Sequence, residues 1–247
     1  MAARIHGQSH TARNRVFALT LALGSGFWPL RCYAMQGLFS SSHSPGTHVT
    51  TFQVGYFVGS LAKASINRKL AVACTRLAPP ELEFKEIPIG DLPLYSYDYD
   101  KDFPPAAKAL KHALASVDAV LFVTPEYNRS IPGALKNAID WASRPWGTNS
   151  FSRKPSAIIG TSPGKIGTAV AQQHLRSILA FCNSPLMNAI EAYIEFTPGL
   201  ITDDGEVTVD ATSEFLANYM KEYYAYITRV YTAIPRTTGE YRTDNAS

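Results

Sequence analysis

A buried-strand pattern that runs directly into a long polar turn constrains this chain more than any other feature. Residues 118–124 read Asp-Ala-Val-Leu-Phe-Val-Thr, an apolar run typical of a parallel strand covered on both faces. The segment from Pro125 to Trp141 follows at once: Pro-Glu-Tyr-Asn-Arg-Ser-Ile-Pro-Gly-Ala-Leu-Lys-Asn-Ala-Ile-Asp-Trp. Its second half has the apolar stripe of a helix, so the polar turn lies at the carboxyl end of a strand. That edge is where open α/β sheets bind ligands.

The rest of the chain alternates between strand-like and helix-like segments. The patterns predict strands at 51–58, 82–89, 118–124, 155–162 and within 185–196, and helices at 66–77, 105–116, 133–143, 166–181 and 210–231. This alternation indicates an α/β fold: a doubly wound, five-stranded parallel sheet with helices on both faces. The element order suits a flavodoxin-like sheet with strand order 2-1-3-4-5.

Composition excludes several classes of function. Hydrophobic residues make up 46% of the 247 residues and charged residues 17%, which allows a sizeable core. The net charge of +3 is uneven: residues 1–48 hold four arginines and no acid, which leaves 19 Lys+Arg against 20 Asp+Glu, a net of −1, in the rest. Nothing there indicates a nucleic-acid partner. The three cysteines have no paired spacing, so we expect neither a disulfide framework nor a metal site.

Residues 1–48 read as a leader before the folded domain, which we place at 49–232, with a loose tail at 233–247. An Arg- and Ser-containing, acid-free start resembles an organelle transit peptide, and the apolar core from Val16 to Leu23 resembles a signal sequence. An over-extended start, with translation beginning at Met35 or later, and a folded extension are the other interpretations. The apolar run is too short for stable membrane insertion. We expect a cytoplasmic protein, or a mitochondrial or other organellar one if the transit peptide is real.

A second candidate loop follows the first predicted strand. Residues 59–67 read Gly-Ser-Leu-Ala-Lys-Ala-Ser-Ile-Asn and open a helix. Backbone amides at a helix N-terminus suit a phosphate group, and Ser60, Ser65 and Asn67 add polar side chains. The alternative is that Ser65 or Asn67 only caps the helix.

These motifs resemble the NADPH-dependent FMN reductase family, in particular its quinone and chromate reductase branch. The segment from Pro125 to Trp141 resembles the family's second signature, and residues 59–67 resemble its phosphate-binding pattern Gly-Ser-x-Arg-x-x-Ser-x-Asn. This chain has Ala62 in place of the arginine, with Lys63 next to it, and a lysine offers a point charge where an arginine offers a bidentate fork. Residues 162–167, Ser-Pro-Gly-Lys-Ile-Gly, resemble the family's third flavin-contacting loop.

The resemblance implies an FMN-dependent reductase in which hydride passes from NADPH or NADH through FMN to a two-electron acceptor. That acceptor is a quinone by preference, with chromate, azo compounds or free flavin as incidental ones. No catalytic side chain is implied, because the cofactor carries the chemistry. The implied FMN-binding residues are Ser60, Lys63, Ser65, Asn67, Pro125, Glu126, Tyr127, Asn128, Ser162 and Gly164.

Several of these residues have a structural alternative. Glu126 is equally well a solvated carboxylate, Tyr127 a half-buried aromatic residue, and residues 162–167 an ordinary glycine turn. Lys136 and Asp140 stand four apart, which favours a surface ion pair on a helix. We expect Trp141 in the core or at a subunit interface.

Self-association and two other functions complete the set of hypotheses. The resemblance implies a homodimer or homotetramer, with Arg176 and Glu191 as a candidate inter-subunit ion pair. The alternatives to a reductase are a non-enzymatic, flavodoxin-like electron carrier and a cofactor-poor binding module. The near-neutral body argues against a carrier with an acidic docking face.

Overall fold

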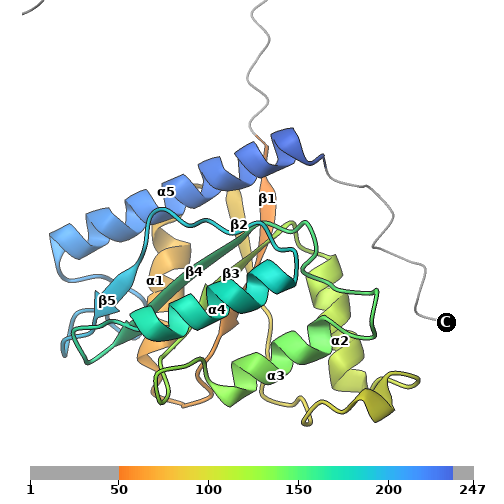
Figure 1. Ribbon diagram of the computed structural model, residues 1–247. Coiled ribbons are helices and arrows are strands. Elements are labelled where there is room, and N and C mark those ends of the chain that lie inside the picture. The colour runs from red at the N-terminus through yellow and green to blue at the C-terminus, as the bar shows by residue number, and fades with distance from the viewer. Residues whose placement is uncertain (1–49, 236–247) are drawn as a thin grey trace, which may run out of the picture. The chain divides into compact units, whose positions relative to one another are not determined.

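The computed structural model describes residues 50–235 (Figure 1). The predictions for the leader and for the end of the tail lie outside these residues. Five parallel strands form one sheet in the order β2-β1-β3-β4-β5, which confirms the predicted topology. Their bounds are β1 (Phe52–Val58), β2 (Leu82–Glu86), β3 (Ala119–Val123), β4 (Ser156–Ser162) and β5 (Tyr193–Glu195).

Helices cover both faces of the sheet, as Figure 1 shows. They are α1 (Ile66–Leu77), α2 (Pro105–Ala115), α3 (Gly133–Ala142), α4 (Ala169–Phe181) and α5 (Asp210–Ala233), with a short 3-10 helix η1 (Tyr97–Tyr99) before α2. Side chains of α1 and α5 pack on one face of the sheet, and those of α2, α3 and α4 pack on the other. Every residue of β3 is buried, because this central strand is covered on both sides.

Two predicted boundaries are wrong by three residues, each for a local reason. Helix α4 begins at Ala169, three residues later than predicted, because Gly167 and Thr168 have φ angles of 56° and 74°. Left-handed residues cannot be part of an α-helix. Strand β2 ends at Glu86, short of the predicted Ile89, and Pro88 follows, a residue that cannot donate to a ladder.

Helix α5 is fixed to the sheet by tyrosines. The Tyr219 hydroxyl donates to the Ile158 carbonyl of β4 at 2.7 Å, and the Tyr231 hydroxyl donates to the Asp118 carbonyl just before β3.

Burial raises the pKa of the Cys74 thiol, which lies in the same core, to about 12. This thiol is therefore a packed, protonated group and not a nucleophile.

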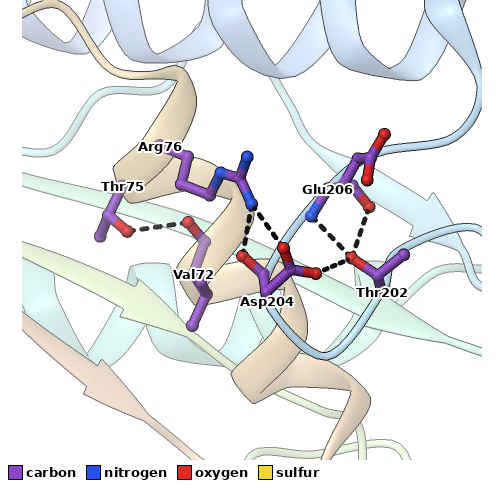
Figure 2. A network of polar contacts seen from close by, with 6 residues as sticks. All are labelled: Val72, Thr75, Arg76, Thr202, Asp204 and Glu206. Carbon is purple, nitrogen blue, oxygen red and sulfur yellow. Dashed lines mark hydrogen bonds and ion pairs between the residues drawn. The ribbon is translucent and has the colours of Figure 1, made fainter.

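A polar network fixes the connection between β5 and α5 to helix α1 (Figure 2). Arg76 Nη1 donates to the Asp204 carbonyl at 2.7 Å and to its Oδ2 at 3.2 Å, and the Thr202 hydroxyl donates to the other carboxylate oxygen. The hydrogen bond from the Thr202 hydroxyl lowers the pKa of Asp204 below its ordinary value, and a backbone hydrogen bond and Arg76 lower it further. Gly205, with φ 82°, completes the turn, because a Cβ there would overlap the backbone of α1.

Residues 50–235 contain no helix long and apolar enough to cross a membrane. Within the same residues, histidine, cysteine and carboxylate side chains form no cluster of metal-ligand size.

Candidate functional site

Three loops lie at the carboxyl edge of the sheet. They follow β1, β3 and β4, which are neighbours in the sheet, and each leads toward a helix. Because the three strands are parallel and adjacent, the loops meet at one edge. All ten predicted cofactor-binding residues belong to these loops or to the helix start that follows the first loop.

The first loop, residues 59–65, has backbone donors without acceptors. Ser65 is the N-cap of α1, and its hydroxyl accepts from the Arg68 N–H at 3.2 Å. In the part of the chain that the structure describes, no protein group accepts a hydrogen bond from the backbone N–H groups of residues 63–67. The first turn of α1 contains no acidic residue, and Lys63 is exposed beside it. A run of free amides at a helix N-terminus has the chemistry of an anion-binding site.

The Asn67 side chain joins the start of α1, just after the first loop, to the end of β4, just before the third loop. Its Nδ2 donates to the Thr161 carbonyl at 2.9 Å, and its Oδ1 accepts from the Thr161 N–H at 3.0 Å. The hydrogen bonds between β3 and β4 end with the bond from the Thr124 N–H to the Ile159 carbonyl. Beyond that point, on the side of β4 that faces away from β5, the Asn67 side chain binds the Thr161 backbone in place of a strand. The Asn67 side chain is buried and pairs the backbone of Thr161, so it does not cap the helix.

The second loop is a tight turn after β3. Tyr127 and Ser130 exchange two backbone hydrogen bonds of 3.0 Å, and Asn128 and Arg129 between them have φ angles of 52° and 62°. Two successive left-handed residues define a type I′ turn, which is strained at an arginine. The Tyr127 hydroxyl lies 3.5 Å from Ser60 Oγ, so the first two loops touch here. Tyr127 is 49% exposed, which leaves its ring accessible to a ligand.

The Glu126 side chain turns away from solvent toward helix α4. Its Oε2 accepts from the N–H groups of Val170 and Ala171 at 3.0 and 3.1 Å, and its Oε1 lies 3.1 Å from Arg129 Nη1. Only 10% of this side chain is exposed. The alternative of a solvated loop carboxylate is therefore wrong.

The third loop, residues 162–168, is compact. Ser162 Oγ donates to the Gly164 carbonyl and accepts from the Gly164 N–H, each at 3.1 Å. Gly167 lies against the backbone of β5, where a Cβ would be 2.6 Å from the Tyr193 carbonyl carbon. The loop therefore has small residues where two backbones approach closely.

Other predicted contacts lie away from this edge. Lys136 and Asp140 form the predicted ion pair at 2.7 Å, and Trp141 is fully buried in the core of this chain. Within the described residues, Arg176 Nη1 donates to Asn188 Oδ1 at 2.8 Å. A cleft of about 300 Å³ with Trp146 and Cys182 in its lining lies where α3 and α4 end, at the amino edge of the sheet.

The model of the NADPH-dependent FMN reductase family matches residues 52–198, a range that contains all three loops. The chain belongs to this family. This confirms the family predicted from the sequence motifs.

Individual members of the FMN reductase family match most of the folded part of the chain. The chain is 49% identical over 175 residues to a 2-hydroxy-1,4-benzoquinone reductase from a Burkholderia species, which covers 71% of this chain and 96% of the relative. It is 39% identical over 186 residues to a quinone reductase from Escherichia coli, which covers 72% and 96%. Among solved structures, the flavoenzyme NAD(P)H:(acceptor) oxidoreductase FerB from Paracoccus denitrificans has a TM-score of 0.70 and 45% identity over 72% of this chain and 98% of that one.

Three contacts that hold the loops together were not predicted from the sequence. Thr161 is paired by Asn67, the N–H groups at the start of α4 are bound by Glu126, and His174 Nδ1 lies 3.0 Å from Ser130 Oγ. One signal was available: the first turn of α4 has no acidic residue. Glu126, the partner of that helix start, lies 44 residues before Val170 in the chain, and only the fold brings the two together.

Proposed function

We propose that this member of the FMN reductase family is an FMN-dependent NAD(P)H oxidoreductase with a quinone-like acceptor. The relatives that carry the name quinone reductase support the acceptor, and chromate, azo compounds and free flavin are secondary acceptors in this proposal. The observation that carries the proposal is the run of free backbone amides at residues 63–67, beside the turn that contains Tyr127.

In this proposal the first loop holds the phosphate of FMN. The amides of residues 63–67 and the Ser60 hydroxyl are the donors, and Lys63 supplies a positive charge in place of the arginine that Ala62 lacks. Ser65 and Asn67 contribute their backbone amides, since their side chains cap α1 and bind Thr161.

The other two loops border the flavin ring. The backbone N–H groups of Glu126 and Asn128 have no acceptor in residues 50–235, so they are available to the polar edge of the ring. Pro125 and the ring of Tyr127 give an apolar surface beside it, and Ser162 and Gly164 border it from the third loop. Backbone donors near the ring stabilise negative charge on a reduced flavin.

FMN supplies the hydride chemistry when bound, accepting hydride from NAD(P)H and passing it to the acceptor. The chain itself orients the ring, excludes water from one side and supplies backbone donors. These tasks need geometry and no nucleophile, so the proposal assigns no catalytic side chain.

The test is a steady-state assay of the purified full-length chain with FMN, NADPH or NADH, and 1,4-benzoquinone. A reductase gives turnover with parallel double-reciprocal lines, since both substrates use one site in turn. A protein that binds FMN without oxidising NAD(P)H would be an electron carrier, and one that binds no FMN would be a cofactor-poor module. Either result would overturn the proposal.

Lys63 offers a matched test of the phosphate site. Lys63→Ala should weaken FMN binding by about 3- to 10-fold, the effect of one partly exposed charge near a phosphate. The control is Lys221→Ala, which removes an exposed lysine within α5, a helix that belongs to none of the three loops, and should leave FMN binding unchanged. Fluorescence titration of FMN measures both, and equal affinities in the two variants would exclude Lys63 from the site.

Self-association and a cytoplasmic location belong to the same proposal. We infer a homodimer or homotetramer in which Arg176 and Glu191 lie at a subunit contact. Sedimentation velocity at two protein concentrations tests assembly, and a monomer throughout would contradict it. Cell fractionation of the full-length chain tests the location, and an organellar fraction would favour the transit-peptide interpretation.

A further inference from the structure

The start of helix α4 depends on a residue from another loop. Thr168, at the N-cap position, has φ 74° and makes no side-chain capping bond, and the first turn contains no acidic residue. The Ala169 N–H donates to the Ile166 carbonyl, and the Gln172 N–H donates to the Thr168 carbonyl. The N–H groups of Val170 and Ala171 would be unsatisfied without Glu126, whose carboxylate binds both.

Glu126 replaces the missing local cap. A carboxylate at a helix N-terminus satisfies two amides and interacts favourably with the helix dipole, as an acidic N-cap does. Here the carboxylate comes from the loop after β3, so capping also fixes that loop to α4. Arg129 binds the remaining oxygen, so both carboxylate oxygens are used inside the protein.

A second contact runs parallel to the first. His174 Nδ1, one turn farther along α4, lies 3.0 Å from Ser130 Oγ at the other end of the tight turn. Residues 126–130 are therefore attached to α4 at both ends, with the strained Asn128 and Arg129 between the two attachments. Strained turns persist only where their surroundings hold them.

We propose that Glu126 is a positioning residue, which holds the turn at residues 127–130 against helix α4 and so sets the spacing between the second and third loops of the flavin site. This inference rests on the proposed function, because the spacing matters for a ligand that touches both loops. Glu126 differs here from a side-chain ligand of FMN: its carboxylate binds protein amides, and its backbone N–H remains for the flavin.

The consequence for binding is a change in population. Without the carboxylate, the turn is docked in only a fraction of molecules, and the apparent dissociation constant of FMN rises by the inverse of that fraction. Loss of a helix cap corresponds to a factor of about 10 in such an equilibrium. We expect Glu126→Ala to weaken FMN binding by about 10-fold and to raise amide exchange at Val170 and Ala171 by a similar factor.

Two conservative variants separate positioning from a direct effect of charge. Glu126→Gln keeps the length and an acceptor oxygen but loses the charge, whereas Glu126→Asp keeps the charge and is one methylene too short to reach both amides. Positioning predicts that the glutamine variant binds FMN within about 3-fold of the wild type and better than the aspartate variant. The comparison of the glutamine and aspartate variants still tests the positioning role of Glu126 if the alanine variant does not fold.

The experiment is a fluorescence titration of FMN with the full-length wild type and the three variants, together with amide exchange at Val170 and Ala171. The matched control is Asp140→Asn, which removes a carboxylate from an exposed ion pair on α3 and should change neither result. If the aspartate variant binds FMN better than the glutamine variant, or if Glu126→Ala loses amide protection without weakening FMN binding, the inference is overturned. A wild type that binds no FMN would instead overturn the proposed function, and the inference with it.

Discussion

At the scale of single residues, the Asn67 side chain links two elements of the fold. Its amide uses one donor and one acceptor to pair the backbone of Thr161, in a buried position between α1 and β4. Asparagine is one of the few residue types with both functions on one planar group. Aspartate has the same shape as asparagine, but its ionised carboxylate has no hydrogen-bond donor.

Asn67→Asp should therefore destabilise the protein by about 2–4 kcal/mol near neutral pH, because a carboxylate oxygen would face the Thr161 carbonyl without a proton between them. A protonated carboxyl can donate, so burial and this contact raise the pKa of the introduced acid. The loss should then diminish as the pH falls toward 5, since the folded state binds the proton more tightly than the unfolded state.

Urea unfolding of the apoprotein at two pH values measures this effect. Asn188→Asp is the matched control: Asn188 is exposed and accepts from Arg176, an interaction that an aspartate keeps. An Asn67→Asp loss below about 1 kcal/mol, or one that grows on acidification, would contradict the double hydrogen bond.

Gly160 carries a different constraint at the same edge. A Cβ at this residue in β4 would overlap both the Thr124 carbonyl oxygen and the Thr168 hydroxyl. Gly160→Ala should lower the free energy of unfolding by about 3 kcal/mol or more, or prevent folding. Gly133→Ala is the control, because a Cβ there meets nothing within 4 Å and alanine suits the start of α3. Thermal unfolding measures both variants, and an equal change in melting temperature would contradict the close packing at Gly160.

At the scale of single elements, Lys111 of α2 holds the end of α3. Its Nζ donates to the carbonyls of Arg144 and Thr148 at 2.7 Å and to that of Ala142 at 3.3 Å. These bonds satisfy carbonyl groups at and beyond the end of α3, which the helix itself leaves without partners. Burial lowers the pKa of Lys111 from 10.5 to about 8.

The lowered pKa of Lys111 predicts the direction in which its contribution to stability changes with pH. Between about pH 8 and pH 10.5 the unfolded chain holds the lysine proton and the folded chain does not. The contribution of Lys111 to the free energy of unfolding therefore rises with pH in that window. In urea unfolding, the stability difference between wild type and Lys111→Met should be larger at pH 9.5 than at pH 7.5. A difference that shrinks over this range would show that the pKa of Lys111 is not lowered.

The sequence predicted most elements because their patterns are local. The spacing of apolar residues gave α1 its observed bounds, and the apolar run at 118–124 indicated a strand that is buried throughout. The predicted start of α4 was wrong because Thr168 adopts a left-handed conformation that its residue type does not favour. The tertiary contact of α4 with Glu126 compensates for the missing cap, and such a contact has no local signal.

At the scale of the whole molecule, the fold places one set of polar groups where three strands end. The strand order and the three candidate loops could be predicted, because both follow from the alternation of strands and helices. The roles of Glu126 and Asn67 could not, because a side chain that binds another loop looks the same in sequence as one that binds a ligand. The flavin-contacting residues themselves stay a prediction.

An anaerobic spectrum of the full-length chain with FMN, before and after addition of NADPH or NADH, tests the FMN-dependent reductase activity directly. Flavin bound to protein absorbs at about 450 nm, and this band is lost on two-electron reduction. We expect bound FMN whose band bleaches within seconds and returns on addition of 1,4-benzoquinone. Bound FMN that resists both nucleotides, or a chain that binds no FMN, would contradict it.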